Sequence, residues 1–437
     1  MSAGSAAATP DQPASPVSAG ERLAALDTLR GVAVLGILMM NIYAFAMPFA
    51  GYMNPLNAGG SEWYNLGTWF VTHILADQKF ISIFSMLFGA GIVLMWQRAS
   101  ERGASFGRIF YRRMFWLLVI GLLHGYLIWF GDILFYYAVI GMLVYFARGW
   151  RPRTLIVAAC VLLPVTLVMS YGGYVQMLAM QSEATNIAAL RDAGEILTDE
   201  QQATLDEWNV MGGFMAPTAE NIREDLEAHR GSYADIMQHR VPQLVNMQVS
   251  SVFFMFWRVG GMMLIGMAFM KLGILSGQRA PSVYNKLMLI GYGLGLPIML
   301  FSAYDLHAHQ FDGFYFMKQG SIANYVGSIL IAFGHIGLVM RLVQRGVWHK
   351  LMQRFAAVGR MAFSNYLMHS IILTSVFYGY GLGLYGEVPR AGQMLFVAGV
   401  IGLQLIISPW WLARYRFGPA EWLWRSLTYW RRQPMRA

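Results

Sequence analysis

A histidine and an aspartate stand at the junction of two apolar stretches and could act as an acid–base pair. His124 lies in the outer half of one predicted membrane span, and Asp132 follows eight residues later, at the turn to the next span. A carboxylate that holds one imidazole nitrogen orients the ring and stabilises its charged form, as a general base requires. The alternative is structural, since a lone histidine within the membrane is often only a hydrogen bond between helices.

Arg258 is the third catalytic candidate because it lies deep within an apolar span. It is about 12 Å from the outer end of that span, too deep for its guanidinium to reach water easily. Such a charge must face a polar cavity or a carboxylate, and Asp132 and Asp77 are the available partners. We therefore predict one polar cavity in the outer half of the membrane, lined by Asn41, His124, Asp132 and Arg258. In this cavity His124 is the base, Asp132 orients it and Arg258 stabilises an anion.

Six further polar residues within or beside the apolar stretches are candidate substrate-binding groups: Arg30, Asn41, Lys79, Asn365, Tyr366 and His369. Arg30 and Asn41 are eleven residues apart, about three helical turns or 16 Å, so they can share one helix face. His369 follows Asn365 by four residues and lies on the same face. Structural roles stay open for two of the six. Arg30 can cap its helix together with Asp27, and Lys79 can pair with Asp77 at the membrane interface.

The elements that position these residues are membrane-spanning helices. Hydrophobic residues make up 57% of the 437 residues and charged residues only 13%, whereas soluble proteins carry about 25% charged residues. The apolar residues come in blocks of about 20, long enough to cross a bilayer core, and they show no alternating pattern of strands. The sequence therefore predicts an all-α polytopic membrane protein, a bundle of about ten helices. The predicted spans are 31–50, 78–97, 112–130, 132–147, 154–175, 250–270, 284–303, 321–342, 361–383 and 392–413.

The distribution of charge predicts the orientation of this bundle. Most of the 32 lysines and arginines fall on alternate loops, which the positive-inside bias places in the cytoplasm together with both termini. The insertion at 181–249 holds about half of the 23 acidic residues, so we expect it to be extracytoplasmic and to contain short amphipathic helices. Residues 1–21 are predicted to be a disordered cytoplasmic tail, and residues 22–437 form the helical transmembrane domain. The formal net charge of +9 thus reflects topology, and no nucleic-acid partner is expected.

Two other kinds of site are not supported by the sequence. Asp305, His307, His309 and Asp312 share one outer loop, but nothing fixes a metal geometry there, so no metal site is predicted. The glycines at 291, 293 and 295 lie within a span and do not open a helix after a strand, which excludes a nucleotide-binding fingerprint.

Six stretches carry a family resemblance when they are taken together: 26–31 with Asn41, 79–89, His124 with 131–134, Arg258 with 261–267, 359–366 and 417–425. In this combination the chain resembles the YeiB-like family of bacterial inner-membrane proteins, which carries domain of unknown function 418. The resemblance extends from about Arg22 to Tyr429. It implies a multi-pass protein of the bacterial plasma membrane.

The YeiB-like family is similar to a wider group of transmembrane acyltransferases, among them the acyltransferase 3 family and lysosomal heparan glucosaminide acetyltransferase. Acyltransferase 3 proteins have an arginine, ten residues and then a histidine in the first span. Arg30 matches the arginine, and Asn41 stands at the position of the histidine. The glucosaminide acetyltransferase has its key histidine before the second span, where the nearest histidine in this chain is His73.

These features lead to one main functional expectation. The resemblance implies an acyltransferase that moves an acyl group from cytosolic acyl-CoA, as co-substrate, to an extracytoplasmic glycan or lipid-linked acceptor. The basic cytoplasmic rim would hold the phosphates of CoA, and no permanently bound cofactor is expected. Two alternatives remain: a small-molecule transporter that uses the same buried charges, and a non-catalytic membrane assembly or sensor protein that binds partners through the acidic insertion.

Overall fold

The computed structural model describes residues 24–215 and 217–436, so the tail predicted at 1–21 lies outside the described residues. The described residues form helices and no β-strand. The helices of the first half are α1 (Ala24–Ala46), α2 (Phe49–Met53), α3 (Trp63–Leu75), α4 (Lys79–Glu101), α5 (Phe106–Leu127), α6 (Leu134–Val144), α7 (Pro152–Asp192) and α8 (Asp199–Met215). Those of the second half are α9 (Ala219–Arg230), α10 (Tyr233–Met255), α11 (Gly261–Lys271), α12 (Pro281–Ala308), α13 (Gly313–Tyr315), α14 (Ser321–Arg345), α15 (His349–Arg360), α16 (Ala362–Phe377), α17 (Arg390–Leu412) and α18 (Pro419–Tyr429).

This architecture confirms the all-α polytopic membrane fold. Seven helical segments of the described chain are long and apolar enough to cross a bilayer, and Leu134–Gly149 is a shorter apolar helix. The predicted spans 112–130, 132–147 and 361–383 are not among the seven. The first corresponds to α5, which has three arginines among its first eight residues, and the last to α16, which has only 16 residues. The turn predicted at Gly131-Asp132 separates α5 from α6.

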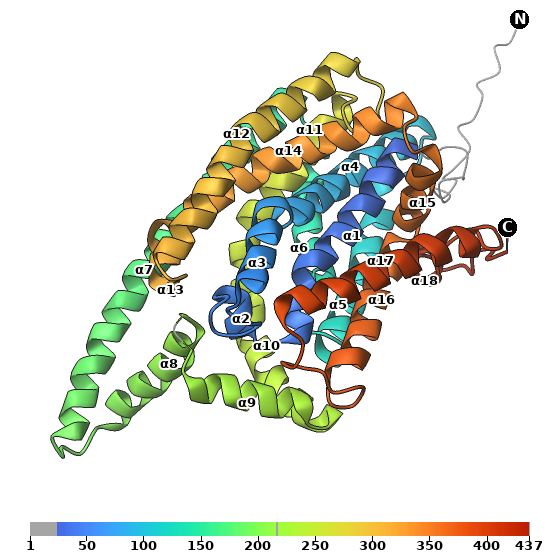
Figure 1. Cartoon of the computed structure of the whole chain (residues 1–437). Helices are drawn as coiled ribbons and strands as arrows, with labels where there is room; N and C mark the ends of the chain where they lie inside the picture. The colour runs from blue at the N-terminus through green and yellow to red at the C-terminus, as the bar shows by residue number, and fades with distance from the viewer. Residues whose placement is uncertain (1–23, 216, 437) are drawn as a thin grey trace, which may run out of the picture.

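The acidic insertion at 181–249 is largely helical, and helix α7 extends into it from the membrane span predicted before it. Helix α7 continues past the predicted end at residue 175 to Asp192, because no glycine or proline lies between Tyr174 and Gly194. Figure 1 shows α7 leaving the bundle and α8 and α9 returning along its base. The two short helices predicted within the insertion are therefore present, as α8 and α9.

Buried and exposed apolar residues distinguish the centre of the bundle from its periphery. Leu29, Ala33 and Leu38 of α1 are fully buried, which places this helix at the centre. Val161 and Val168 on α7 are 66% and 70% exposed. Because exposing apolar side chains to water is unfavourable, we infer that this face of the long apolar helix α7 contacts lipid.

Glycines allow helices of the bundle to approach closely. A Cβ at Gly89 of α4 would overlap the backbone of Met263, and one at Gly266 of α11 would overlap the backbone of Met86. These reciprocal contacts show that Gly89 and Gly266 let α4 and α11 pack backbone against backbone. Gly91, two residues further on, has no heavy atom within 4 Å of the position of a Cβ. It faces a cavity instead of a helix.

Candidate functional site

One large cavity opens within the bundle, with a volume of about 300 Å³. Residues from α1, α4, α5, α6, α15, α16 and α18 line it. Along α4 the lining runs from Phe84 to Arg102, eighteen residues or about 27 Å of helix. A cavity of this size and depth is within the range of small-molecule sites.

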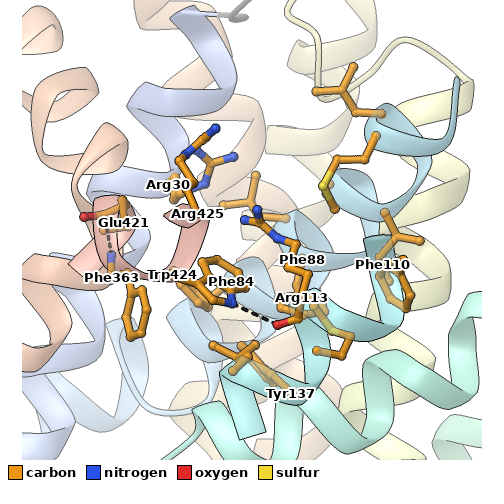
Figure 2. A pocket seen from close by; sticks show the side chains of 18 of the residues that line it. Arg30, Phe84, Phe88, Phe110, Arg113, Tyr137, Phe363, Glu421, Trp424 and Arg425 are labelled. Carbon is orange, nitrogen blue, oxygen red and sulfur yellow. Dashed lines mark hydrogen bonds between the residues drawn. The ribbon is translucent and has the colours of Figure 1, made fainter. Parts of the chain in front are cut away.

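The mouth of the cavity is strongly cationic. Six arginines line it: Arg30, Arg98, Arg102, Arg113, Arg360 and Arg425. Asp27 and Glu421 are the acidic residues of the lining, and Asp27 pairs with Arg30 at 2.7 Å. Figure 2 shows Arg30 and Arg425 on one side and Tyr137 at the opposite end. Several guanidinium groups around one opening favour a ligand that carries phosphate or carboxylate groups.

The inner part of the cavity is apolar and aromatic. Phe84 and Phe88 of α4, Phe110 of α5 and Tyr137 of α6 form its walls (Figure 2). Tyr366 lines the same space from α16. A ligand that fits this shape has an anionic head and a slender, mostly apolar arm.

Helix α18 covers the mouth. The indole of Trp424 donates a hydrogen bond to the carbonyl of Arg113, and the Arg113 guanidinium lies 3.6 Å from the centre of the Trp424 ring. The Glu421 carboxylate accepts hydrogen bonds from the first backbone N–H groups of α16, at Phe363 and Ser364. Burial raises the pKa of Glu421 against the effect of these bonds. The C-terminal helix is thereby attached to the start of α16 and to α5.

The predicted pair of His124 and Asp132 is present and buried behind the inner end of the cavity. The Nδ1 atom of His124 lies 2.8 Å from Asp132, whose other oxygen accepts the backbone N–H of Phe135 at 2.7 Å. The Nε2 atom of His124 lies 2.8 Å from the hydroxyl of Ser370 on α16. His124, Asp132 and Ser370 are 2%, 6% and 0% exposed.

Tyr366 separates this buried group from the cavity. Its hydroxyl donates to the carbonyl of Gly131 and accepts the N–H of Ile133, each at 3.2 Å. Its ring centre lies 5.3 Å from that of His124. Of the predicted substrate-binding residues, Arg30 and Tyr366 therefore line the cavity at its opposite ends.

Arg258 lies in a different cluster from His124. It sits in a π-helical turn, Phe256–Gly260, and donates to the hydroxyls of Ser82 and Ser328 at 3.1 and 2.8 Å. Its guanidinium also faces the ring of Tyr325. Within the described chain, no hydrogen bond or ion pair links Arg258 to His124. The expected carboxylate partner is thus replaced by hydroxyls and an aromatic face, which also stabilise a buried cation.

Lys79 belongs to the same side of the bundle as Arg258. It is fully buried and donates to the carbonyl of His73. His73 lies 3.4 Å from Asp77, which also accepts the side-chain amide of Asn324 at 2.7 Å. Neither Lys79 nor Arg258 lines the cavity. The single polar cavity that sequence analysis predicted therefore corresponds to two separate buried clusters.

Asn365 and His369 connect α16 to α17. The amide of Asn365 donates to Ser408, and His369 hydrogen-bonds to Gln404 at 2.9 Å. Asn41 is half-buried on α1 and makes no hydrogen bond to His124 among the described residues. These three candidates lie outside the cavity, and the geometry of the first two is that of helix-to-helix contacts.

Residues that the sequence analysis missed complete the site. Ser370, Arg113, Glu421 and Arg425 were not selected, although Glu421 and Arg425 lie within one of the stretches that carry the family resemblance. Ser370 follows Tyr366 by four residues, so it lies on the same helix face. Serines are common in apolar helices, so sharing a helix face with Tyr366 was not enough to identify Ser370 as a site residue.

A carboxylate on the opposite end of the bundle holds the insertion in place. Asp225 of α9 lies 3.0 Å from His229, 3.4 Å from His239 and 2.9 Å from the hydroxyl of Tyr385, in the connection between α16 and α17. Burial alone would raise the pKa of Asp225, but the hydrogen bonds from these three groups outweigh it and lower the pKa.

We expect Asp225→Asn to loosen the docking of α9 at neutral pH. A lost hydrogen bond to a charged group costs about 1.5–3 kcal/mol. Because the folded pKa is depressed, this stabilisation is complete above the ordinary aspartate pKa of about 4 and is lost as the pH falls below it. At pH 7 the amides of 219–230 should therefore be protected from hydrogen exchange in the unmodified chain and less protected in Asp225→Asn. Glu224→Gln, at an exposed neighbour, is the control. Equal protection in Asp225→Asn would contradict this role.

The fold and the site together define a class: a multi-pass helical membrane protein with an arginine-lined cavity beside a buried Asp–His–Ser group. Comparison with known proteins gives the family. Residues 269–431 match the family model described as "Protein of unknown function (DUF418)". The chain is 31% identical to YeiB of Escherichia coli (strain K12), over 93% of this chain and 96% of that protein. It is 30% identical to YxaH of Bacillus subtilis (strain 168), over 96% and 97%. Both relatives are described as uncharacterized. The chain belongs to this YeiB-like DUF418 family.

Proposed function

We propose that this protein is a transmembrane acyltransferase that takes an acyl group from acyl-CoA and delivers it to an extracytoplasmic or lipid-linked acceptor. One observation carries the proposal: a cavity with six arginines at its mouth and an apolar interior ends beside a buried histidine. Acyl-CoA has the matching shape, with anionic phosphates at one end, a slender arm and a reactive thioester at the other end.

The position of His124 also suggests the size of the acyl group. The phosphates would bind at the arginines of the mouth, and the arm would lie between Phe84, Phe88 and Tyr137. The thioester carbonyl must then reach the inner end, because His124 lies behind it. A long acyl chain would occupy that end itself, so we propose a short acyl group such as acetyl.

The same proposal fixes the orientation in the plasma (inner) membrane of a bacterium. The arginines of the mouth belong to the loops that the positive-inside bias assigns to the cytoplasm, where acyl-CoA is made. Both termini would be cytoplasmic, and α8 and α9 would face the other side. In Figure 1, α15 and α18 lie at the end of the bundle away from α9.

This orientation can be tested with single cysteines. In a Cys160→Ala background, Thr204→Cys on α8 should react with a membrane-impermeant maleimide in intact cells. Lys350→Cys on α15 should react only after the membrane is opened. Lys350 is exposed and Thr204 is half-buried, so neither position is closed to the reagent from its own side of the membrane. Labelling of both positions from the same side would contradict the topology.

The binding of acetyl-CoA tests the function itself. We expect Arg425→Gln to weaken binding about tenfold, because a hydrogen bond from a charged group contributes about 1.4 kcal/mol or more. Arg414→Gln removes the same charge from an exposed position outside the cavity and should leave affinity unchanged. Titration calorimetry of the purified chain in detergent measures both. No binding by the unmodified chain, or equal loss in the two variants, would refute the proposal.

A small-molecule transporter is the second candidate, and the fully buried Lys79 with the partly buried Asp77 and Arg258 favours it. The two candidates differ in their products. In proteoliposomes loaded with acetyl-CoA on one side, a transferase releases free CoA on that side in proportion to the acceptor modified. A transporter moves its substrate and releases no CoA.

A further inference from the structure

Ser370, His124 and Asp132 form a hydrogen-bonded chain in the order found in nucleophilic serine enzymes. Asp132 holds Nδ1 of the imidazole, and Nε2 lies 2.8 Å from the serine hydroxyl. With Asp132 ionised, Nδ1 must carry a hydrogen and Nε2 is left as an acceptor. The Ser370 hydroxyl then donates to Nε2, which is the arrangement that lets a histidine remove the proton of a serine.

This order of hydrogen bonds does not by itself identify a nucleophile, because a second Ser–His–Asp group occurs among the described residues. Ser302 lies 3.1 Å from Nε2 of His73, and Nδ1 of His73 lies 3.4 Å from Asp77. Both distances are longer than those around His124. Neither group contributes a residue to the lining itself, so the neighbours of each group decide which one a ligand can approach.

The cavity distinguishes the two groups. Its lining includes Tyr366, one helical turn before Ser370, and Ile133, directly after Asp132. A ligand arm that reaches the inner end of the cavity therefore ends at Tyr366, whose ring centre lies 5.3 Å from that of His124, the hydrogen-bond partner of Ser370. Since Ser370 is fully buried, contact requires the Tyr366 side chain to move away from Gly131 and Ile133.

We propose that Ser370 is the catalytic nucleophile and carries the acyl group as a serine ester between donor and acceptor. This inference rests on the proposed acyltransferase function and adds a covalent step to it. A serine ester would also separate the two half-reactions in time. CoA can leave through the arginine-lined mouth before the acceptor reaches the ester from elsewhere.

The two half-reactions balance with His124 as the only proton carrier. First, the Ser370 oxygen attacks the thioester carbonyl while His124 takes the hydroxyl proton. The carbon–sulfur bond breaks, and His124 returns the proton to the sulfur as CoA leaves. Second, an acceptor hydroxyl or amine loses its proton to His124 and attacks the serine ester. The ester carbon–oxygen bond breaks, and the proton restores the Ser370 hydroxyl.

Two probes of the purified full-length chain test this step. An alkyl fluorophosphonate reports an activated serine without any donor, and radiolabelled acetyl-CoA without acceptor reports the ester. We expect both to modify the peptide that contains Ser370 and acetyl-CoA to release CoA in a burst equal to the enzyme concentration. Ser370→Ala should lose both modifications, and Ser370→Cys should be acetylated as a thioester. Ser302→Ala, in the other Ser–His–Asp group, should behave as the unmodified chain.

The outcomes separate this step from the proposed function. If the unmodified chain transfers acetyl groups while Ser370→Ala keeps its rate and no ester forms, transfer is direct and the nucleophile is overturned, although the acyltransferase stands. If the unmodified chain neither binds nor cleaves acetyl-CoA, both proposals fail. A melting temperature for each variant shows that the loss of ester is not a loss of fold.

Discussion

Replacing His124 by alanine should reduce acyl transfer by about 10²- to 10⁴-fold, the usual contribution of a general base. The reason is that His124 alone contacts both the Asp132 carboxylate and the Ser370 hydroxyl. Release of CoA from acetyl-CoA by the purified protein is the measurement. Binding of acetyl-CoA should change little, because His124 lies behind the cavity lining.

His335→Ala is the matched control for this variant. His335 on α14 also bridges helices: its Nε2 donates to the carbonyl of Leu75 at 3.0 Å, and its Nδ1 forms a hydrogen bond with the hydroxyl of Tyr292 at 2.8 Å. It is outside the cavity, so its loss should lower the melting temperature and leave turnover intact. If His124→Ala and His335→Ala lose the same stability and both keep turnover, His124 is only a structural contact.

The fold could be predicted because lipid imposes strong constraints on sequence. Charge is expensive in the membrane, and apolar blocks of about 20 residues therefore mark the spans. The prediction was weakest where that rule is relaxed. The first turns of α5 carry three arginines, of which Arg113 lines the cavity and Arg108 is exposed. The end of α7 was predicted at residue 175, which is too early, because a helix can continue beyond the surface of the bilayer.

The site was only partly predictable, and the reason differs between residues. His124 and Asp132 are eight residues apart on one hairpin, so local geometry brings them together. Arg258 is far away in sequence, and its depth in the membrane says nothing about which neighbour it faces. The structure places it against Ser82 and Ser328 of α4 and α14. Depth can be estimated from helix rise, but rotation about the helix axis cannot.

The role of the C-terminal helix α18 could not be predicted from the sequence, although part of it belongs to a stretch that carries the family resemblance. Residues 417–425 were recognised as a stretch that carries the resemblance, without a role. The structure gives them one: Glu421 caps α16, and Trp424 packs on Arg113 at the mouth of the cavity. An amphipathic helix outside the membrane is thus part of the site, which hydropathy alone cannot show.

Filling the cavity should weaken ligand binding strongly without unfolding the protein. Gly91 lines the cavity and has no heavy atom within 4 Å of an added Cβ, so the side chain of Gly91→Leu would project into the cavity. A ligand forced against it would lose about 1–3 kcal/mol, as overpacking does, or about 10- to 100-fold in affinity. The melting temperature should stay or rise, because glycine within a helix costs about 1 kcal/mol relative to alanine. Calorimetry with acetyl-CoA and thermal unfolding measure the two effects.

Gly293→Leu separates the loss of cavity volume from the substitution itself. Gly293 also has open space at its Cβ position, but it lies on α12 and outside the cavity lining. Both variants gain the same helix propensity and the same side chain, so only occupation of the cavity differs between them. Unchanged acetyl-CoA affinity in Gly91→Leu would mean that the ligand binds elsewhere. An equal loss in Gly293→Leu would mean that the membrane-facing surface, and not the arginine-lined cavity, controls binding.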